Sequence, residues 1–152
     1  MTITREKAFT VYLIVLIALS LAVAGWFYVR RASSDISRVG NLTRAVDKIV
    51  ERAGTEQAVM VNVNSGAMSI DSGTLDHTYR WRQNRVEARP LTPIRANPFS
   101  VRQVRWDRIA QMFRDDPSVT DFTITSRAGS IEARVVRNGK GMNIPVDAYF
   151  SN

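Results

Sequence analysis

Residues 61–70 read VNVNSGAMSI, and this stretch decides the fold that we expect for the chain. Apolar and polar residues alternate through AVMVNVN (58–64), which is the period of a strand with one buried face. The inward set is expected to be Val59, Val61 and Val63, and the outward set Met60, Asn62 and Asn64. Ser65 and Gly66 then turn the chain into a second strand, 67–71. The stretch therefore predicts an antiparallel pair of strands.

A helix is expected before this pair, and a hairpin after it. The helix begins near Asn41, where apolar residues recur at the spacing of one buried helical face. These residues are Leu42, Ala45, Val46, Ile49 and Val50. Gly54 supplies the C-terminal stop. The hairpin is predicted from strands at 77–81 and 85–88 around a turn at 82–84.

The second half of the chain shows the same order of elements. A helix is expected at 104–114, ended by Asp115-Asp116-Pro117. Its buried face is predicted to hold Val104, Ile109, Met112 and Phe113. A strand then begins at Phe122 and Ile124, and two further strands, 130–136 and 142–146, flank an Asn138-Gly139 turn. Prolines 90, 93 and 98 make the intervening 91–102 an irregular connector.

Overlaying the halves indicates an internal repeat. The matching segments are VDKIVERA (46–53) with WDRIAQMF (106–113), VNVNSGAMSI (61–70) with FTITSRAGSI (122–131), and RQNRVEARP (82–90) with RNGKGMNIP (137–145). Each unit is a helix followed by a meander of about three strands. Neither unit buries its apolar faces alone, so we predict one α+β domain with two helices against an antiparallel sheet.

The N-terminus carries an uncharged apolar run, AFTVYLIVLIALSLAVAGWFYV (8–29), followed by Arg30 and Arg31. As a helix it is about 33 Å long and matches a hydrocarbon core of about 30 Å. We expect a single transmembrane helix; a secretory signal cut after Ala24 stays open as the alternative. The predicted segments are a tail (1–7), the span (8–29), a linker (30–40), a first α-β-β-β repeat (41–90), the connector (91–102) and a second repeat (103–152).

Ala18, Ala22 and Gly25 share one side of this span, where a second helix could approach closely. They are the candidate helix-packing face, although small residues are also simply common in membrane helices. A second candidate surface lies in the arginine-rich stretch 77–108. On a strand, Tyr79 and Trp81 share one face and the intervening arginines share the other. The candidate anion- or partner-binding residues are Arg80, Arg82, Arg85, Arg89, Arg105 and Arg108.

Arginine binds phosphate bidentately, which suits anionic lipid head groups. The chain's net charge of +7 would add attraction to an anionic membrane. The alternative is a solvated sheet face whose arginines pair with Asp71, Asp76, Glu87 and Glu132.

Catalytic and metal sites are not predicted. His77 is the only histidine, and Asp76, its neighbour on a strand, would point to the opposite face. The absence of cysteine excludes disulfides, thiolate metal sites and a cysteine nucleophile. Asp115-Asp116 is interpreted as a helix-ending turn. We expect no cofactor, no metal and no nucleic-acid partner.

The helix-then-meander unit, TYRWRQNRVEARP (78–90) included, resembles the small PepSY-type domains. Over 42–146 the chain is also similar to membrane-anchored extracytoplasmic proteins of unknown function from actinobacteria. The resemblance implies this fold, an extracytoplasmic domain, and binding or inhibition of neighbouring proteins rather than catalysis. It offers no diagnostic motif, so no site residue is carried over.

Orientation and source rest on weaker signals. Basic residues follow the span more densely than they precede it, which favours a cytoplasmic C-terminal domain. Domains of about 120 residues, however, translocate largely regardless of charge, so this count does not decide the side. We expect an extracytoplasmic domain because the resemblance implies one. The 18 arginines against 3 lysines indicate a GC-rich bacterial genome.

Three functions follow as hypotheses. The first is a non-enzymatic accessory, assembly or regulatory subunit that contacts another membrane protein or complex. The second is a module that binds anionic phospholipid or a cell-envelope polymer. The third is an enzyme with an unrecognised site.

Overall fold

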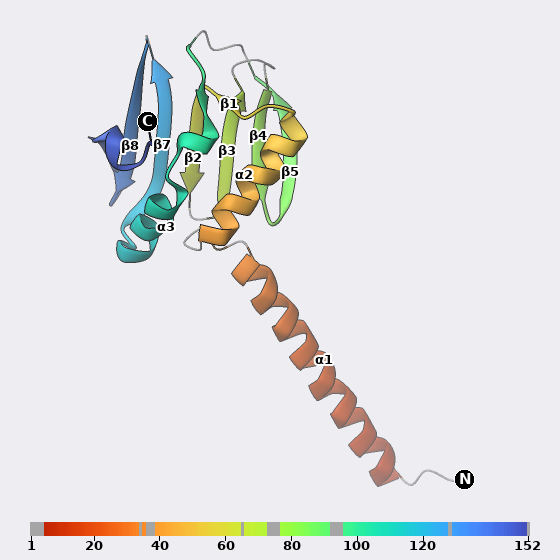
Figure 1. Cartoon of the computed structure of the whole chain (residues 1–152). Coiled ribbons are helices and arrows are strands. Elements are labelled where there is room, and N and C mark those ends of the chain that lie inside the picture. Colours follow the sequence, from red (N-terminus) through yellow and green to blue (C-terminus); the bar gives the residue numbers. More distant parts are fainter. Residues whose placement is uncertain are drawn as a thin grey trace. The chain divides into compact units, whose positions relative to one another are not determined.

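The computed structural model describes residues 5–33, 35, 39–64, 66–72, 77–91, 96–127 and 129–151 (Figure 1). The chain divides after Ser33 into two units, an N-terminal helix and a folded domain.

The N-terminal unit is one long helix, α1 (Arg5–Ser33). Within it, Phe9–Val29 has a mean hydropathy of 2.3 and no side chain buried by the rest of the protein. The hydroxyl of Ser20 donates to the carbonyl oxygen of Leu16 at 2.8 Å, so this polar group in mid-helix is satisfied within the helix. The helix is long and apolar enough to span a membrane, as its sequence predicts. It also extends into the predicted linker, since it ends at Ser33 rather than Val29.

The folded domain is an α+β structure built on an antiparallel sheet of seven strands in its described residues, in the order β5-β4-β3-β2-β7-β8-β9. The strands are β2 (Met60–Asn64), β3 (Ala67–Ser72), β4 (His77–Arg82), β5 (Arg85–Pro90), β7 (Val119–Arg127), β8 (Ser130–Arg137) and β9 (Lys140–Ile144). A second, two-stranded pairing joins β1 (Gln57–Ala58) to β6 (Phe99–Ser100). The remaining elements are α2 (Val39–Ala53), η1 (Val101–Gln103), α3 (Trp106–Asp115) and η2 (Val146–Ala148).

Figure 1 shows α2 and α3 in front of the same face of the sheet. The core lies between them. The inward side of α2 is buried as its spacing predicts, with Leu42, Ala45, Val46 and Ile49 no more than 1% exposed. On the sheet, the core is formed by Val61, Val63, Met68, Ile70, Tyr79, Trp81, Phe122, Ile124, Ala133 and Val135. Because strand side chains alternate, the intervening residues point away from the helices.

Turns with positive φ lie where the sequence places them. Gly54 ends α2 at φ +69° and donates to the carbonyl oxygen of Val50 at 2.9 Å. Asn138 and Gly139 join β8 to β9 at φ 50° and 73°, the conformation that favours Asn-Gly in two-residue hairpins. Gln83 and Asn84 take the same conformation between β4 and β5, although glutamine is uncommon there.

Several predicted boundaries are wrong. The second helix begins at Trp106, because Val104 instead pairs with Phe150 in an isolated bridge. The connector 91–102 contains β6 and the start of η1, so part of it is regular. Val146 lies in η2 rather than in the last strand. The first half also supplies four strands to the large sheet and the second half three, so the two meanders are unequal.

The C-terminal residues complete the core, which the sequence patterns did not indicate. Their backbone pairs with the segment before α3: Arg105 N donates to Tyr149 O at 2.9 Å, and Ser151 N donates to Gln103 O at 2.7 Å. The Tyr149 ring packs at 5.1 Å from the Phe122 ring, measured between centroids. This segment therefore helps to hold α3 against β7.

Candidate uncovered sheet face

The face of the large sheet opposite to α2 and α3 is polar, and no described helix of the folded domain lies on it. Strand β4 shows the division clearly. Tyr79 and Trp81 are 6% and 0% exposed in the core, whereas Arg80 is partly exposed and Arg82 exposed on the other side. The predicted alternation of arginines and aromatics is confirmed. The aromatic rings are therefore part of the core, and the uncovered face presents arginine without them.

One polar row crosses the whole uncovered face. The register pairs Arg80 with Glu87 and Ser69, and Ser69 in turn with Asn62. Asn62 also pairs with Thr123 on its other side, Thr123 with Arg134, and Arg134 with Asn143. We call this the cross-sheet row: Glu87, Arg80, Ser69, Asn62, Thr123, Arg134 and Asn143. Each of the seven strands contributes one residue to it.

The centre of the row is internally bonded. Asn62 Nδ2 donates to Thr123 Oγ1 at 2.9 Å across the junction between β2 and β7. The Asn62 side-chain carbonyl oxygen then remains as an acceptor, and the second Nδ2–H of Asn62 and the Thr123 hydroxyl proton remain as donors. The centre of the face is thus fixed in position and still able to form hydrogen bonds.

Two hollows flank this centre. The β3–β4 hollow, of about 300 Å³, is lined by Asn62, Asn64, Ser69, Thr78, Arg80 and Arg89, together with Ala67 and Met68. The β7–β8 hollow, of about 310 Å³, is lined by Met60, Thr123, Thr125, Arg127, Glu132, Arg134 and Asn143. Each hollow therefore contains one arginine of the cross-sheet row.

The arginines differ in how they are held. Arg89 forms an ion pair with Glu87 at 3.1 Å, as the solvated-face alternative predicted. Among the described residues, no carboxylate forms an ion pair with Arg80 or Arg134. The Arg134 guanidinium lies over Gly141, and a methyl group added to that glycine would overlap it. Arg80 and Arg134 are thus available cations in the two hollows.

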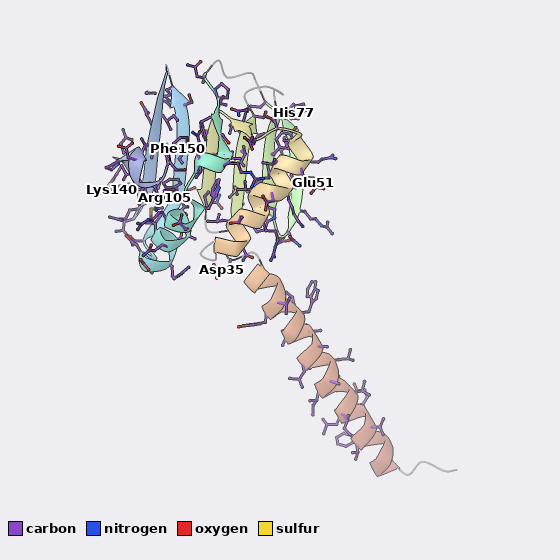
Figure 2. All side chains as sticks on the ribbon, in the orientation of Figure 1. Asp35, Glu51, His77, Arg105, Lys140 and Phe150 are labelled. Carbon is purple, nitrogen blue, oxygen red and sulfur yellow. The ribbon has the colours of Figure 1, made fainter. Side chains whose placement is uncertain are left out.

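The six candidate arginines do not form one surface. Arg80, Arg82, Arg85 and Arg89 lie on the uncovered face, on β4 and β5. Arg105 and Arg108 instead lie at the start of α3, on the helix-covered side, and Figure 2 shows Arg105 beside this helix. These two line a third hollow of about 480 Å³ together with Gln111, Met112, Asp115, Asp116, Arg137, Ala148 and Tyr149. Proximity in sequence did not predict proximity in space because α3 packs across the sheet.

Two acidic residues identified from the sequence, Asp116 and Asp71, contact other neighbours than the candidate arginines. Asp116 ends α3, as predicted: it accepts from Ser118 N at 3.0 Å and pairs with Arg137 at 2.7 Å. The hydrogen bonds from Ser118 hold the pKa of Asp116 below its usual value, and Arg137 adds to this. Asp71 is only 4% exposed, and this burial raises the pKa of its carboxyl group. A hydrogen bond with Thr78 lowers the pKa by a smaller amount. Asp71 therefore pairs with a hydroxyl rather than with arginine.

His77 begins β4, and its ring lies 6.2 Å from the ring of Tyr79. Figure 2 shows it well away from Arg105. Asp76 lies outside the described residues. In the part of the chain that the structure describes, no three of His, Cys, Asp and Glu gather into a possible metal site.

On α1, Ala18, Ala22 and Gly25 are exposed. The small-residue packing face remains a prediction.

Four residues of the cross-sheet row were not predicted as site residues from the sequence: Ser69, Thr123, Arg134 and Asn143. The available signal was the polar side of each alternating strand, which was identified for 60–64 and for Arg80 and Arg82 but not for the neighbouring strands. The order of strands was also needed, because it places residues from both halves side by side. Comparison of the chain with protein-family models, with curated proteins and with solved structures finds no match.

Proposed function

We propose that the chain is a non-enzymatic, single-pass membrane protein that acts as an accessory, assembly or regulatory subunit. Its span is α1, and its contact surface is the uncovered face of the sheet. The observation that carries the proposal is that α2 and α3 cover the same face while the cross-sheet row and two hollows line the other. Clefts with a few convergent polar groups are common sites of ligand binding.

Within the membrane, we assign contacts with another membrane protein to the side of α1 that carries Ala18, Ala22 and Gly25. Small residues allow close helix approach, and van der Waals packing is then gained on both sides. Replacing the three residues by leucine is expected to release a partner that packs there. We place the folded domain outside the cytoplasm of a bacterial cell, as the resemblance to PepSY-type domains implies.

Affinity purification in mild detergent tests the proposal. The tagged full-length chain would be recovered from its own membranes as wild type, as Ser69→Tyr and as Gln111→Tyr. Ser69→Tyr fills the β3–β4 hollow on a strand, where tyrosine is well tolerated, and Gln111→Tyr places the same side chain on α3. We expect a stoichiometric companion that Ser69→Tyr weakens and Gln111→Tyr keeps. Equal recovery with both variants would refute the use of the uncovered face.

A second candidate function, binding of anionic phospholipid or a cell-envelope polymer, is favoured by the free arginines in the hollows. Guanidinium groups bind phosphate and carboxylate through two parallel hydrogen bonds. Retained phospholipid or polymer without a protein companion would favour this candidate over the first.

We also propose that the two halves arose by duplication. Asn62 and Thr123 occupy equivalent positions in the matched segments 61–70 and 122–131, and they pair with each other between β2 and β7. A two-fold axis through this pair would relate the two strands. The match of 82–90 with 137–145 has less support. Among the described strands of the large sheet, three, β3 to β5, follow β2 in the first half, whereas only two, β8 and β9, follow β7 in the second half.

A further inference from the structure

We propose that the uncovered face binds an elongated, hydroxyl-bearing polymer whose anionic groups, carboxylates or phosphates, are held by Arg80 and Arg134. This inference rests on the second candidate function proposed for that face and names the chemistry of the polymer. The two arginines lie in separate hollows, on β4 and β8. Four strand steps separate them, which is about 19 Å at about 4.8 Å per strand. A single small anion cannot reach both.

The residues between the two arginines favour a hydroxylated ligand. Ser69, Asn62 and Thr123 continue the row from one arginine to the other, and Asn64, Thr78 and Thr125 line the hollows. Hydroxyl and amide groups both donate and accept hydrogen bonds, as polymer hydroxyls require. The ligand would therefore lie across the strands, with an anionic group at each end of the contact.

The same face lacks the aromatic anchors that are common in protein interfaces. Energetically dominant contacts between proteins are enriched in tryptophan, tyrosine and arginine, and of these the described residues of the uncovered face present only arginine. In the described part of the folded domain, Met142 is the only large apolar side chain more than a third exposed, at 39%. It pairs with the buried Val135, so it lies on the side of the sheet that the helices cover. The face offers charge and hydrogen bonds rather than aromatic anchors, which suits an anionic, hydroxylated polymer.

Gly141 offers a probe that changes no charge. A methyl group there would displace the Arg134 guanidinium, which is the mobile end of a flexible side chain. The φ of Gly141 is not positive, so alanine fits its backbone. Gly141→Ala should therefore move Arg134 out of its position without unfolding β9.

The experiment measures binding of fluorescein-labelled polyuronate to the full chain in nanodiscs of zwitterionic lipid at about 0.15 M salt, where weak long-range attraction is screened. Arg80→Ala and Arg134→Ala should each lower the affinity about tenfold, in line with the loss of one charged hydrogen-bonding group. Gly141→Ala should lower it by a similar factor. Arg108→Ala removes the same charge from α3 and should change the affinity less than about twofold. A disaccharide of the same polymer, too short to reach both arginines, should bind more weakly than the polymer.

Other outcomes overturn the inference. Equal losses for Arg108→Ala and Arg80→Ala would reduce the binding to net charge. Polyglutamate that binds as tightly as polyuronate would assign the face to an acidic protein, and binding only to anionic vesicles would assign it to lipid. Any of these results can coexist with loss of a companion in Ser69→Tyr, so failure of this inference is distinguishable from failure of the proposed function.

Discussion

Replacing Trp81 tests the reasoning that divides β4 into a core face and a binding face. The indole is 0% exposed, and its Nε1–H has no hydrogen-bond partner in the described part of the structure. Trp81→Ala should cost about 3–5 kcal/mol in the free energy of unfolding, as other large-to-small core substitutions do. Trp81→Phe removes burial worth about 1.6 kcal/mol, taken as two carbon atoms at about 0.8 kcal/mol each. It also removes a buried unpaired donor that costs about 1–3 kcal/mol.

The two terms for Trp81→Phe nearly cancel, so this variant should unfold within about 1.5 kcal/mol of wild type. Arg80→Ala, on the opposite face of the same strand, should change stability by less than about 0.5 kcal/mol. Urea unfolding of the full chain in detergent micelles, followed by circular dichroism, measures all three. The reasoning is refuted if Trp81→Phe destabilises as much as Trp81→Ala, or if Arg80→Ala does.

Three further predictions concern ionisation, turn geometry and anchoring. Burial raises the pKa of Asp71 above 3.8, so ionising its carboxyl group lowers the stability of the folded state as the pH rises above that value. The Asp71→Asn variant should therefore have a higher melting temperature than wild type at pH 7. The difference in melting temperature should vanish below pH 3.8, where the carboxyl group is protonated in both states. Gln83 has φ 49°, a conformation that asparagine adopts more readily, so Gln83→Asn should stabilise the protein by about 0.5–1 kcal/mol. The same substitution in α3, Gln111→Asn, should destabilise it slightly. Melting temperatures that shift in the same direction for both variants would contradict the turn assignment. Leu16→Arg and Leu19→Arg should each cost about 2.5–3.5 kcal/mol in the free energy of membrane insertion. Carbonate extraction should then release these variants from the membrane, whereas Leu19→Val should stay in it.

The periodic parts of the fold were predictable from sequence because each pattern reports a local burial environment. The alternation through 59–64 identified which side of β2 is buried, and the spacing of α2 identified its inward face. Gly54 and Asn138-Gly139 were identified because positive φ restricts the choice of residue. Short pairings such as β1 with β6 were not predicted, because two residues are too few to show a period of alternating apolar and polar residues.

The site was less predictable because it depends on which strands become neighbours. Arg80 was identified from its local alternation with Tyr79 and Trp81. Arg134 was not, since its place in the cross-sheet row requires β2 to pair with β7 across about half of the domain. Arg105 was grouped with Arg80 wrongly, because linear proximity ignores the crossover that carries α3 onto the covered face.

Labelling of single cysteines in intact membranes tests the central claim most directly. The chain contains no cysteine, so each introduced thiol is unique. Asn143→Cys places a thiol on the uncovered face, and Gln111→Cys places one on α3; both positions are exposed. If a partner occupies the uncovered face, maleimide should label Asn143→Cys slowly in native membranes and rapidly after the partner is stripped by detergent and salt, while Gln111→Cys labels rapidly in both. Equal, rapid labelling of both thiols in native membranes would contradict the account.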